Sequence, residues 1–375
     1  MIDVRNFYNA LIDNGVEFFA GVPDSLLKDI CSYITDETPS NKNFITANEG
    51  AAIALAAGYN IATGKVPLVY MQNSGLGNAV NPILSLADKE VYGIPMLLMI
   101  GWRGEPGIKD EPQHIKQGRV QNALLDAMEI PYYVLDSDST DYANLIEEAC
   151  KLTVKRQAPA AIIIKKNTFN DYCLKKEIIP KFEMSRETAI ETLLSKLPVD
   201  SIIVSTTGKS SREVFEYRVR NLQNNNRDFL TVGSMGHCSQ IALGIALNTN
   251  QKVFCLDGDG SLIMHMGSMG IVGKNAPNNF YHILLNNGSH ESVGGQPTVG
   301  YDIDFPGIAL SCGYNKAISV SSKSEFEVEI DNVLRYDGPV LLEIKVNKSS
   351  RNNLGRPSST PIENKKALID FIKKR

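Results

Sequence analysis

An aspartate flanked by glycines and an asparagine further along the chain have the residue types and spacing of a metal site. Gly258-Asp259-Gly260-Ser261 follows the apolar run Lys252–Leu256, and Asn287 follows the run Tyr281–Leu285. Because the carboxyl ends of neighbouring parallel strands meet at one edge of a sheet, this carboxylate and this amide oxygen are expected to lie close together. Such oxygen ligands suit a hard divalent cation, most naturally magnesium, that bridges to phosphate oxygens. The glycines let the backbone approach a diphosphate, and the segment that follows can present helix N-terminal amides to it.

A second carboxylate with a distinctive neighbourhood is Glu49, which precedes the run Gly50-Ala51-Ala52. A helix is expected over Glu49–Ala62, with Glu49 in its first turn. An acidic residue in the first turn is favoured by the helix dipole alone, so this position has a purely structural explanation. The small residues that follow also allow a ligand or a partner helix to pack closely, which favours a functional explanation.

Short apolar runs that alternate with helical patterns provide the elements that must position these residues. Strands are predicted at Val16–Ala20, Val66–Met71, Met96–Ile100, Tyr132–Leu135, Ala160–Ile164, Ile202–Ser205, Lys252–Leu256, Tyr281–Leu285 and Val340–Val346. Helices are predicted, among others, at Glu49–Ala62, Asp138–Val154, Arg186–Leu197 and Gln240–Ala246. Strands that alternate with helices form parallel sheets covered on both faces, so the chain is expected to have an α/β fold of doubly wound parallel sheets.

The chain is expected to contain two domains, residues 1–180 and 181–375. The stretch Lys165–Ser185 interrupts the alternation of strands and helices and is predicted to be a linker. In addition, Ile53-Ala54-Leu55 and Ile241-Ala242-Leu243 each begin the same order of small-residue helix, basic turn, strand and glycine-rich loop, 188 residues apart (241 − 53). Two similarly built domains are therefore favoured over one large sheet, and they could share one ligand between two loop edges.

The composition of the 375 residues argues against several classes of protein. Acidic residues outnumber basic ones by 42 to 38, and the resulting formal charge of −4 argues against binding of nucleic acid or anionic membranes. No apolar run approaches the about 18 residues of a membrane span, and the N-terminus lacks the apolar core of a signal peptide. The six cysteines are scattered without paired spacing, so reduced thiols in a cytoplasmic protein are expected.

The Gly-Asp-Gly motif, with Asn287 placed 28 residues after Asp259 (287 − 259), resembles the signature of thiamine diphosphate enzymes. By that resemblance, the Asp259 carboxylate, the Asn287 side chain and the main-chain carbonyl of Ser289 bind Mg²⁺. The rest of the glycine-rich loop would contact the cofactor through Gly258, Gly260 and Ser261.

The resemblance also assigns roles outside this loop. Glu49 would bond the pyrimidine ring of the cofactor and promote its imino tautomer, which removes a proton from the thiazolium ring. The segment Gly233-Ser234-Met235-Gly236 is similar to the family's loop in which an apolar residue holds the cofactor bent; Met235 would be that residue, with Ser234 beside it. In this family the glutamate and the diphosphate loop come from different subunits, which implies a homodimer or higher homo-oligomer with active sites at the interface. Residues 1–180 would bind the pyrimidine and residues 181–375 the diphosphate, with no central third domain.

Further strings along the chain resemble the phosphonopyruvate decarboxylase family within these enzymes. They are Ala20-Gly21-Val22-Pro23-Asp24-Ser25, Arg103-Gly104-Glu105-Pro106-Gly107, Asp110-Glu111-Pro112-Gln113-His114, the segment Asn287–Pro297 and Leu354-Gly355-Arg356-Pro357. The implied reaction is the decarboxylation of 3-phosphonopyruvate to phosphonoacetaldehyde and carbon dioxide, a step in phosphonate biosynthesis. Asp24, just after a strand, and His114, in a predicted loop, would transfer protons. Asp24 could instead be the N-cap of the next helix.

A phosphonate substrate requires cations, and arginine offers a bidentate geometry that lysine lacks. The candidate substrate-binding residues are Arg103, Gln113, Lys209, His290 and Arg356. Taken singly, each basic residue is more often a surface charge.

Three alternative functions stay open. Sulfopyruvate decarboxylases use the same cofactor on a sulfonate; they can be split into two subunits near residue 180, whereas this chain is continuous. A carboligase would normally carry the missing central domain. A catalytically silent regulatory subunit would have no physical need to combine Glu49, Asp259 and Asn287.

Overall fold

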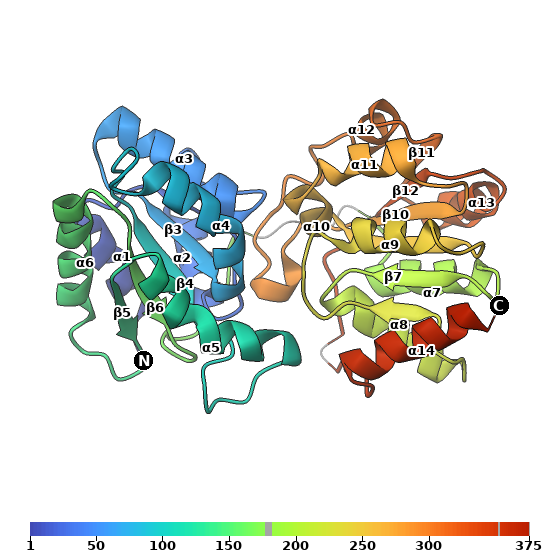
Figure 1. The fold of residues 1–375 in the computed structure, drawn as a ribbon, viewed down its shortest axis with the longest axis horizontal. Coiled ribbons are helices and arrows are strands. Elements are labelled where there is room, and N and C mark those ends of the chain that lie inside the picture. Colours follow the sequence, from blue (N-terminus) through green and yellow to red (C-terminus); the bar gives the residue numbers. More distant parts are fainter. Residues whose placement is uncertain (177–181, 352, 375) are drawn as a thin grey trace. The chain divides into compact units, whose positions relative to one another are not determined.

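The protein divides into two compact units, and each is described by itself. The structure is a computed structural model that describes residues 1–176, 182–351 and 353–374. One unit consists of Met1–Glu177 with His290–Gln296, and the other of Ile178–Ser289 with Pro297–Arg375. Figure 1 shows the fold coloured along the sequence. The predicted boundary between residues 180 and 181 lies outside the described residues.

The first unit is built on a six-stranded parallel sheet with the order β2-β1-β3-β4-β6-β5. Its strands are β1 (Phe19–Gly21), β2 (Asn43–Ile45), β3 (Leu68–Gln72), β4 (Leu97–Gly101), β5 (Tyr132–Leu135) and β6 (Ala160–Ile164). Its helices are α1 (Val4–Asp13), α2 (Lys28–Glu37), α3 (Glu49–Thr63), α4 (Leu76–Pro82), α5 (Pro112–Ala127) and α6 (Tyr142–Arg156), with single turns at η1 (Asn73–Gly75) and η2 (Ile83–Ala87).

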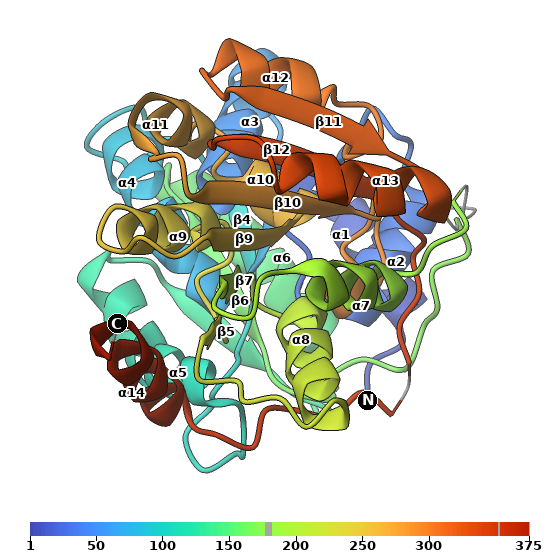
Figure 2. The same ribbon diagram turned by 90° about the vertical axis from the view of Figure 1, so that its right-hand side faces the viewer.

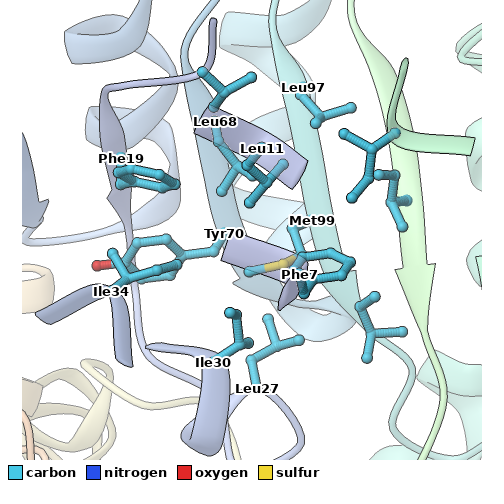
Figure 3. Close-up of a cluster of buried hydrophobic side chains, with 14 of the residues drawn as sticks. Phe7, Leu11, Phe19, Leu27, Ile30, Ile34, Leu68, Tyr70, Leu97 and Met99 are labelled. Atoms are coloured by element: carbon cyan, nitrogen blue, oxygen red, sulfur yellow. The ribbon is translucent and has the colours of Figure 1, made fainter. Parts of the chain in front are cut away.

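Both faces of this sheet are buried, which explains why its central strands are apolar at every position. Successive side chains of a strand point to opposite faces, so Leu68 and Tyr70 pack against α1, α2 and α6. Val69 and Met71 pack against α3 and α4 on the other face. Figure 3 shows the first of these two clusters, in which α1 contributes Phe7. Continuous apolar runs are expected for parallel strands covered on both sides.

The second unit also contains a six-stranded parallel sheet, with the order β11-β12-β10-β9-β7-β8. Its strands are β7 (Ile202–Ser205), β8 (Asp228–Leu230), β9 (Val253–Gly258), β10 (Phe280–Asn286), β11 (Lys316–Val320) and β12 (Val340–Lys345). Its helices are α7 (Arg186–Lys196), α8 (Lys209–Arg220), α9 (Cys238–Ala246), α10 (Asp259–Met264), α11 (Ser268–Asn275), α12 (Phe305–Ser311), α13 (Lys323–Val333) and α14 (Pro361–Lys373), and η3 (Glu291–Val293) lies in the segment that belongs to the first unit. Figure 2 shows α7 and α13 on one side of this sheet and α9 and α11 on the other.

The two sheets have the same topology. Read from the other edge, the second sheet runs β8-β7-β9-β10-β12-β11, which is the order β2-β1-β3-β4-β6-β5 of the first sheet in its own numbering. The prediction of two doubly wound parallel sheets of similar topology is therefore confirmed. Strands β3 and β9 are equivalent, and so are β4 and β10. The loops that follow equivalent strands consequently occupy equivalent places in their sheets.

The structure differs from the sequence-based prediction at the sheet edges and in the predicted linker. Strands β2, β8 and β11 each lie at an edge of a sheet and were not predicted, because each carries polar residues in place of a continuous apolar run. The predicted linker is wrong in its first part, since Phe169 is buried in the core of the first unit. Tyr172 also donates a hydrogen bond from its hydroxyl to Asp36 on α2, at 3.0 Å. Among the helices that the structure describes, none combines the length and the apolar composition needed to cross a membrane.

Candidate functional site

Asp259 is a buried carboxylate at the junction of β9 and α10. The strand ends at Gly258, and Asp259 is the first residue of the six-residue helix α10. Its Oδ1 accepts a hydrogen bond from the backbone amide of Asn287 at 3.3 Å, and its Oδ2 accepts one from the hydroxyl of Thr298. No lysine or arginine in the described part of the chain forms an ion pair with it, and burial raises its pKa to about 6. A buried carboxylate without a basic partner is well suited to bind a cation.

The other predicted metal ligands lie beside this carboxylate. Strand β10 pairs with β9 and ends at Asn286, so the next residue, Asn287, emerges at the same edge of the sheet. Asn287 and Ser289 are both buried, and the Ser289 amide donates to the Asn287 Oδ1 at 3.1 Å. A carboxylate, an amide oxygen and a main-chain carbonyl form an oxygen donor set that fits magnesium. The coordination itself stays a prediction.

Gly300, which follows the loop that begins at Asn287, leaves room for the Asp259 carboxylate. A Cβ atom on Gly300 would lie 2.7 Å from the Asp259 Oδ2, closer than non-bonded contact allows. The carboxylate and the loop are thus fitted to one another. A side chain at this position would displace the oxygen that Thr298 holds.

Ser261 joins three segments of the second unit at the same edge of the sheet. Its Oγ accepts hydrogen bonds from the Thr206 hydroxyl at 3.0 Å and from the Gly236 amide at 3.1 Å. Ser234 and Gly236 have φ angles of 53° and 87°, so the loop that carries Met235 turns sharply through the left-handed region. The structure therefore places Met235 in a loop bound to α10. Its proposed contact with a cofactor stays a prediction.

In the first unit, Glu49 is the first residue of α3, as the sequence predicts. The residue is only 5% exposed, and its Oε2 accepts a hydrogen bond from the Asn78 Nδ2 at 2.7 Å. A Cβ atom on Gly75 would lie 2.4 Å from the Glu49 Oε1. The helix dipole alone would not require this burial or this partner on α4. Asn78 carried no signal in the sequence, because a single asparagine in a helix of small residues resembles many surface positions.

Asp24 is fully buried after β1, and the alternative that it caps the next helix is wrong. Helix α2 begins at Lys28 with Leu27 as its N-cap, and the Asp24 Oδ2 instead accepts from the backbone amide of Leu26 at 3.0 Å. Its Oδ1 has no hydrogen-bond partner among the described residues. Burial raises the pKa of Asp24 to about 6, against the opposing charge of Arg103. A carboxyl group with this pKa can gain and lose a proton near neutral pH.

His114 lies in a helix, which corrects the prediction of a loop histidine. Helix α5 begins at Pro112, and His114 is buried in its first turn. Its Nε2 lies 3.5 Å from the Gln113 Nε2, whereas its Nδ1 has no partner in the described parts of the chain. Burial, and then the charge of Arg103, lower its pKa to about 4. The imidazole is therefore neutral at pH 7.

Most N–H groups of Arg103, which follows β4, already form hydrogen bonds with other side chains of the protein. Its Nε and Nη2 donate to the two carboxylate oxygens of Asp110 at 2.8 and 2.5 Å, and its Nη1 donates to the Ser25 Oγ at 2.6 Å. Its backbone carbonyl accepts from the Asn73 Nδ2 at 2.8 Å. Only the remaining N–H groups of the guanidinium can reach a ligand.

Two buried amides near these residues escaped the sequence-based prediction. Asn73 and Gln121 are 2% and 1% exposed, and the side-chain oxygen of each has no partner within the residues described. An unsatisfied buried polar atom costs about 1–3 kcal/mol, so such atoms favour a site for a polar ligand. Asn73 directly follows β3 and could have been found by the same strand-end rule that identified Asp259.

The remaining predicted substrate residues lie in different places. Lys209 is the first residue of α8, and its Nζ donates to the Ser350 Oγ at 2.6 Å. Arg356 is exposed. His290 belongs to the segment of the first unit that comes from the second half of the chain, and burial lowers its pKa to about 4. Gln113 precedes His114 on α5.

Comparison with known proteins identifies the family of this chain. Residues 4–130 match the thiamine pyrophosphate enzyme N-terminal TPP binding domain, and residues 206–344 match the C-terminal TPP binding domain. The phosphonopyruvate decarboxylase of Streptomyces viridochromogenes is 34% identical over 99% of this chain and 95% of its own length. That of Streptomyces hygroscopicus is 33% identical over 99% and 94%. The sulfopyruvate decarboxylase of Methanosarcina acetivorans is 29% identical over 82% of each chain.

Since the similarity spans nearly the whole of both chains, the protein belongs to the phosphonopyruvate decarboxylase family of thiamine pyrophosphate enzymes.

Proposed function

We propose that the protein catalyses the thiamine-diphosphate- and magnesium-dependent decarboxylation of 3-phosphonopyruvate to phosphonoacetaldehyde and carbon dioxide in phosphonate biosynthesis. The observation that carries this proposal is the full-length similarity to phosphonopyruvate decarboxylases, at 34% identity over 99% of the chain. The burial of Glu49, Asp259 and Asn287 beside the carboxyl ends of two equivalent sheets supports it.

The second unit would hold the cofactor. Asp259, Asn287 and the carbonyl of Ser289 would bind Mg²⁺, and the loop Gly258–Ser261 would lie against the diphosphate. This donor set fits the ion because it offers a buried negative charge that no described basic residue neutralises. When bound, thiamine diphosphate supplies a nucleophilic carbon and an acceptor for the electrons that carbon dioxide leaves behind.

The first unit would supply the proton-transferring groups. Glu49 would share a proton with the pyrimidine ring, and Asn78 would keep its carboxylate oriented through the 2.7 Å hydrogen bond. Asp24, with a pKa of about 6, would hold or release a proton during turnover. His114, which is neutral at pH 7, would hydrogen-bond the substrate through its unpartnered Nδ1.

The substrate anion would be bound by the cations and amides that the sequence singles out. Arg103 offers only the N–H groups that Asp110 and Ser25 leave free, so its role is to position one face of the phosphonate. Gln113, whose Oε1 lacks a partner among the residues described, would bind a protonated phosphonate oxygen. Lys209, His290 and Arg356 complete the proposed set.

Sulfopyruvate decarboxylation is the main alternative. The continuity of the chain does not exclude it, because the sulfopyruvate decarboxylase of Methanosarcina acetivorans aligns along 82% of its own length. The phosphonate is favoured because the similarity to phosphonopyruvate decarboxylases is higher and extends over 99% of the chain. A silent regulatory subunit is disfavoured because burying both Glu49 and Asp259 without a ligand would only lower stability.

The proposal includes a homodimer or larger homo-oligomer in the cytoplasm. Helix α3, which begins with Glu49, exposes Leu55 and Ile61, and such an apolar surface supports contact with a second copy.

The test is carbon dioxide release from phosphonopyruvate, sulfopyruvate and pyruvate, measured in parallel with thiamine diphosphate and Mg²⁺. We expect the fastest turnover with phosphonopyruvate and its loss in Glu49→Gln. Faster turnover of sulfopyruvate would overturn the substrate assignment but not the cofactor. No turnover of any of the three acids would favour the carboligase or the silent subunit.

A further inference from the structure

We propose that Glu343, a buried residue of β12, is a positioning residue that holds the magnesium-binding loop in place through Asn286. The loop has two stems, defined here as the outgoing stem Asn286–Ser289 and the returning stem Pro297–Gly300. The inference rests on the proposed function, because it concerns the residues assigned there to Mg²⁺. Glu343 lies one strand away from them and does not touch the proposed ion.

Glu343 uses both of its carboxylate oxygens inside the second unit. Strand β12 pairs with β10, and Glu343 is 1% exposed. Its Oε1 accepts a hydrogen bond from the Asn286 Nδ2 at 2.7 Å, and its Oε2 accepts one from the Ser319 hydroxyl at 2.6 Å. Because the Glu343 Oε1 accepts this hydrogen bond, Asn286 presents its NH₂ group to Glu343 and not its carbonyl oxygen.

The side chain of Asn286, oriented by Glu343, forms hydrogen bonds to both stems of the loop. Its Nδ2 also donates to the backbone carbonyl of Gly300 at 2.8 Å, and its Oδ1 accepts from the Gly288 amide at 3.2 Å. The side chain is fully buried. One oriented amide therefore fastens the outgoing stem at Gly288 and the returning stem at Gly300. If the amide rotated by 180°, both of these hydrogen bonds would be lost.

The two stems in turn hold the Asp259 carboxylate. From the returning stem, the Gly300 amide donates to the Thr298 Oγ1 at 3.0 Å, and the Thr298 hydroxyl donates to the Asp259 Oδ2. From the outgoing stem, the Asn287 amide donates to the Asp259 Oδ1 at 3.3 Å. The orientation of the Asp259 carboxylate and of Asn287, the proposed Mg²⁺ ligands, thus depends on the hydrogen bond between Glu343 and Asn286. Residues that orient metal ligands in this way typically affect metal affinity by 10–100-fold.

The test compares Mg²⁺ affinity, measured by titration calorimetry in the presence of thiamine diphosphate, with the melting temperature of each variant. We expect Glu343→Leu, which cannot accept a hydrogen bond, to weaken Mg²⁺ binding by about tenfold or more. Glu343→Gln should stay within about threefold of the wild type, because its amide oxygen can still accept from Asn286. Ser319→Ala, which touches Glu343 but not the loop, should leave the affinity unchanged.

Glu213 provides a matched control for the loss of a buried carboxylate. It lies in the same unit, is 3% exposed, and accepts two hydrogen bonds of 2.8 Å from Arg186. Glu213→Gln should lower the melting temperature by several degrees without changing Mg²⁺ affinity, since its two hydrogen bonds of 2.8 Å come from Arg186 on α7. An equal loss of affinity in this control would mean that Glu343 acts through general stability, which would overturn the inference.

Asn286→Ala decides the question if Glu343→Leu does not fold. It should lose Mg²⁺ affinity to a similar extent, and the double variant Asn286→Ala/Glu343→Gln should bind as weakly as Asn286→Ala alone. If Asn286→Ala or Glu343→Leu bound Mg²⁺ as tightly as the wild type, the inference about Glu343 would be overturned, but the proposed function would not. Failure of the wild-type protein to bind Mg²⁺ with thiamine diphosphate would overturn the proposed function, and the inference with it.

Discussion

The backbone amide of Asn287 donates to the Asp259 Oδ1 at 3.3 Å and so joins the ends of β10 and β9. The equivalent strands of the first unit are joined in a similar manner, where the Asn73 Nδ2 donates to the Arg103 carbonyl at 2.8 Å. In both sheets the residues after the third and fourth strands meet because parallel strands end at one edge. The same topology therefore presents the edge proposed to bind the cation in one unit and the edge proposed to transfer protons and bind the substrate anion in the other.

Glu49→Gln is expected to lower kcat by about 10²–10⁴-fold, because the amide cannot accept and return a proton at the cofactor. The affinity for thiamine diphosphate should change by less than about threefold. Steady-state carbon dioxide release and a binding titration measure the two effects. Glu147→Gln, on the exposed surface of α6, is the control and should be unchanged. Equal kcat values for Glu49→Gln and the wild type would contradict the role of Glu49.

Asp24→Asn is expected to stabilise the protein above pH 6 while lowering its activity. The pKa of Asp24 is about 6 when folded and close to 3.8 when unfolded, so the native state binds the proton more tightly. Ionisation of Asp24 therefore lowers the free energy of unfolding as pH rises from about 4 to 6, by up to about 3 kcal/mol. Urea unfolding at pH 5, 6 and 8 should show the variant's advantage growing with pH. An advantage that is independent of pH would mean that ionisation of Asp24 is not its cause.

Asp259→Asn is expected to weaken Mg²⁺ binding by about tenfold or more, because the charged ligand of the proposed site is lost. Thiamine diphosphate binding that depends on Mg²⁺ should weaken in parallel, and EDTA should produce the same loss in the wild type. Calorimetric titration of each ligand in the presence of the other provides the measurement. Unchanged binding of both ligands would exclude Asp259 as a metal ligand.

Gly75→Ala is expected to reduce activity strongly, since the new Cβ would lie 2.4 Å from the Glu49 Oε1 and displace the carboxylate. Gly77→Ala, two residues further along the chain in α4, is the matched control. A Cβ there meets nothing within 4 Å, so activity should be kept and stability slightly raised. Measurement of kcat and of the melting temperature for both variants distinguishes displacement of Glu49 from a general loss of stability. Full activity in Gly75→Ala would show that Glu49 tolerates displacement.

Arg356→Gln is expected to raise KM for phosphonopyruvate by about tenfold or more, if its exposed guanidinium binds the substrate anion. The melting temperature should stay constant. Arg119→Gln, exposed on α5, is the control for a general change in surface charge. An unchanged KM would remove Arg356 from the proposed substrate set.

Central strands and motif residues could be predicted from the sequence because their signals are local. Strands β3, β4, β9 and β10 are buried on both faces and therefore form continuous apolar runs, which predicted them nearly to the residue. Asp259 and Asn287 directly follow such strands, so their proximity could be inferred from the parallel order alone.

The sequence by itself thus determined the fold class, the two-sheet topology and the family, since each depends on residues that are neighbours along the chain. Only the tertiary structure decided that Asp24 is not a helix cap, that His114 lies in a helix, and that Arg103 is engaged by Asp110. It alone identified the supporting residues Asn78, Thr298 and Glu343, which lie 29, 39 and 57 residues from their partners. A single polar residue inside an apolar segment has no local signature, because its role depends on which distant groups the folded chain places beside it.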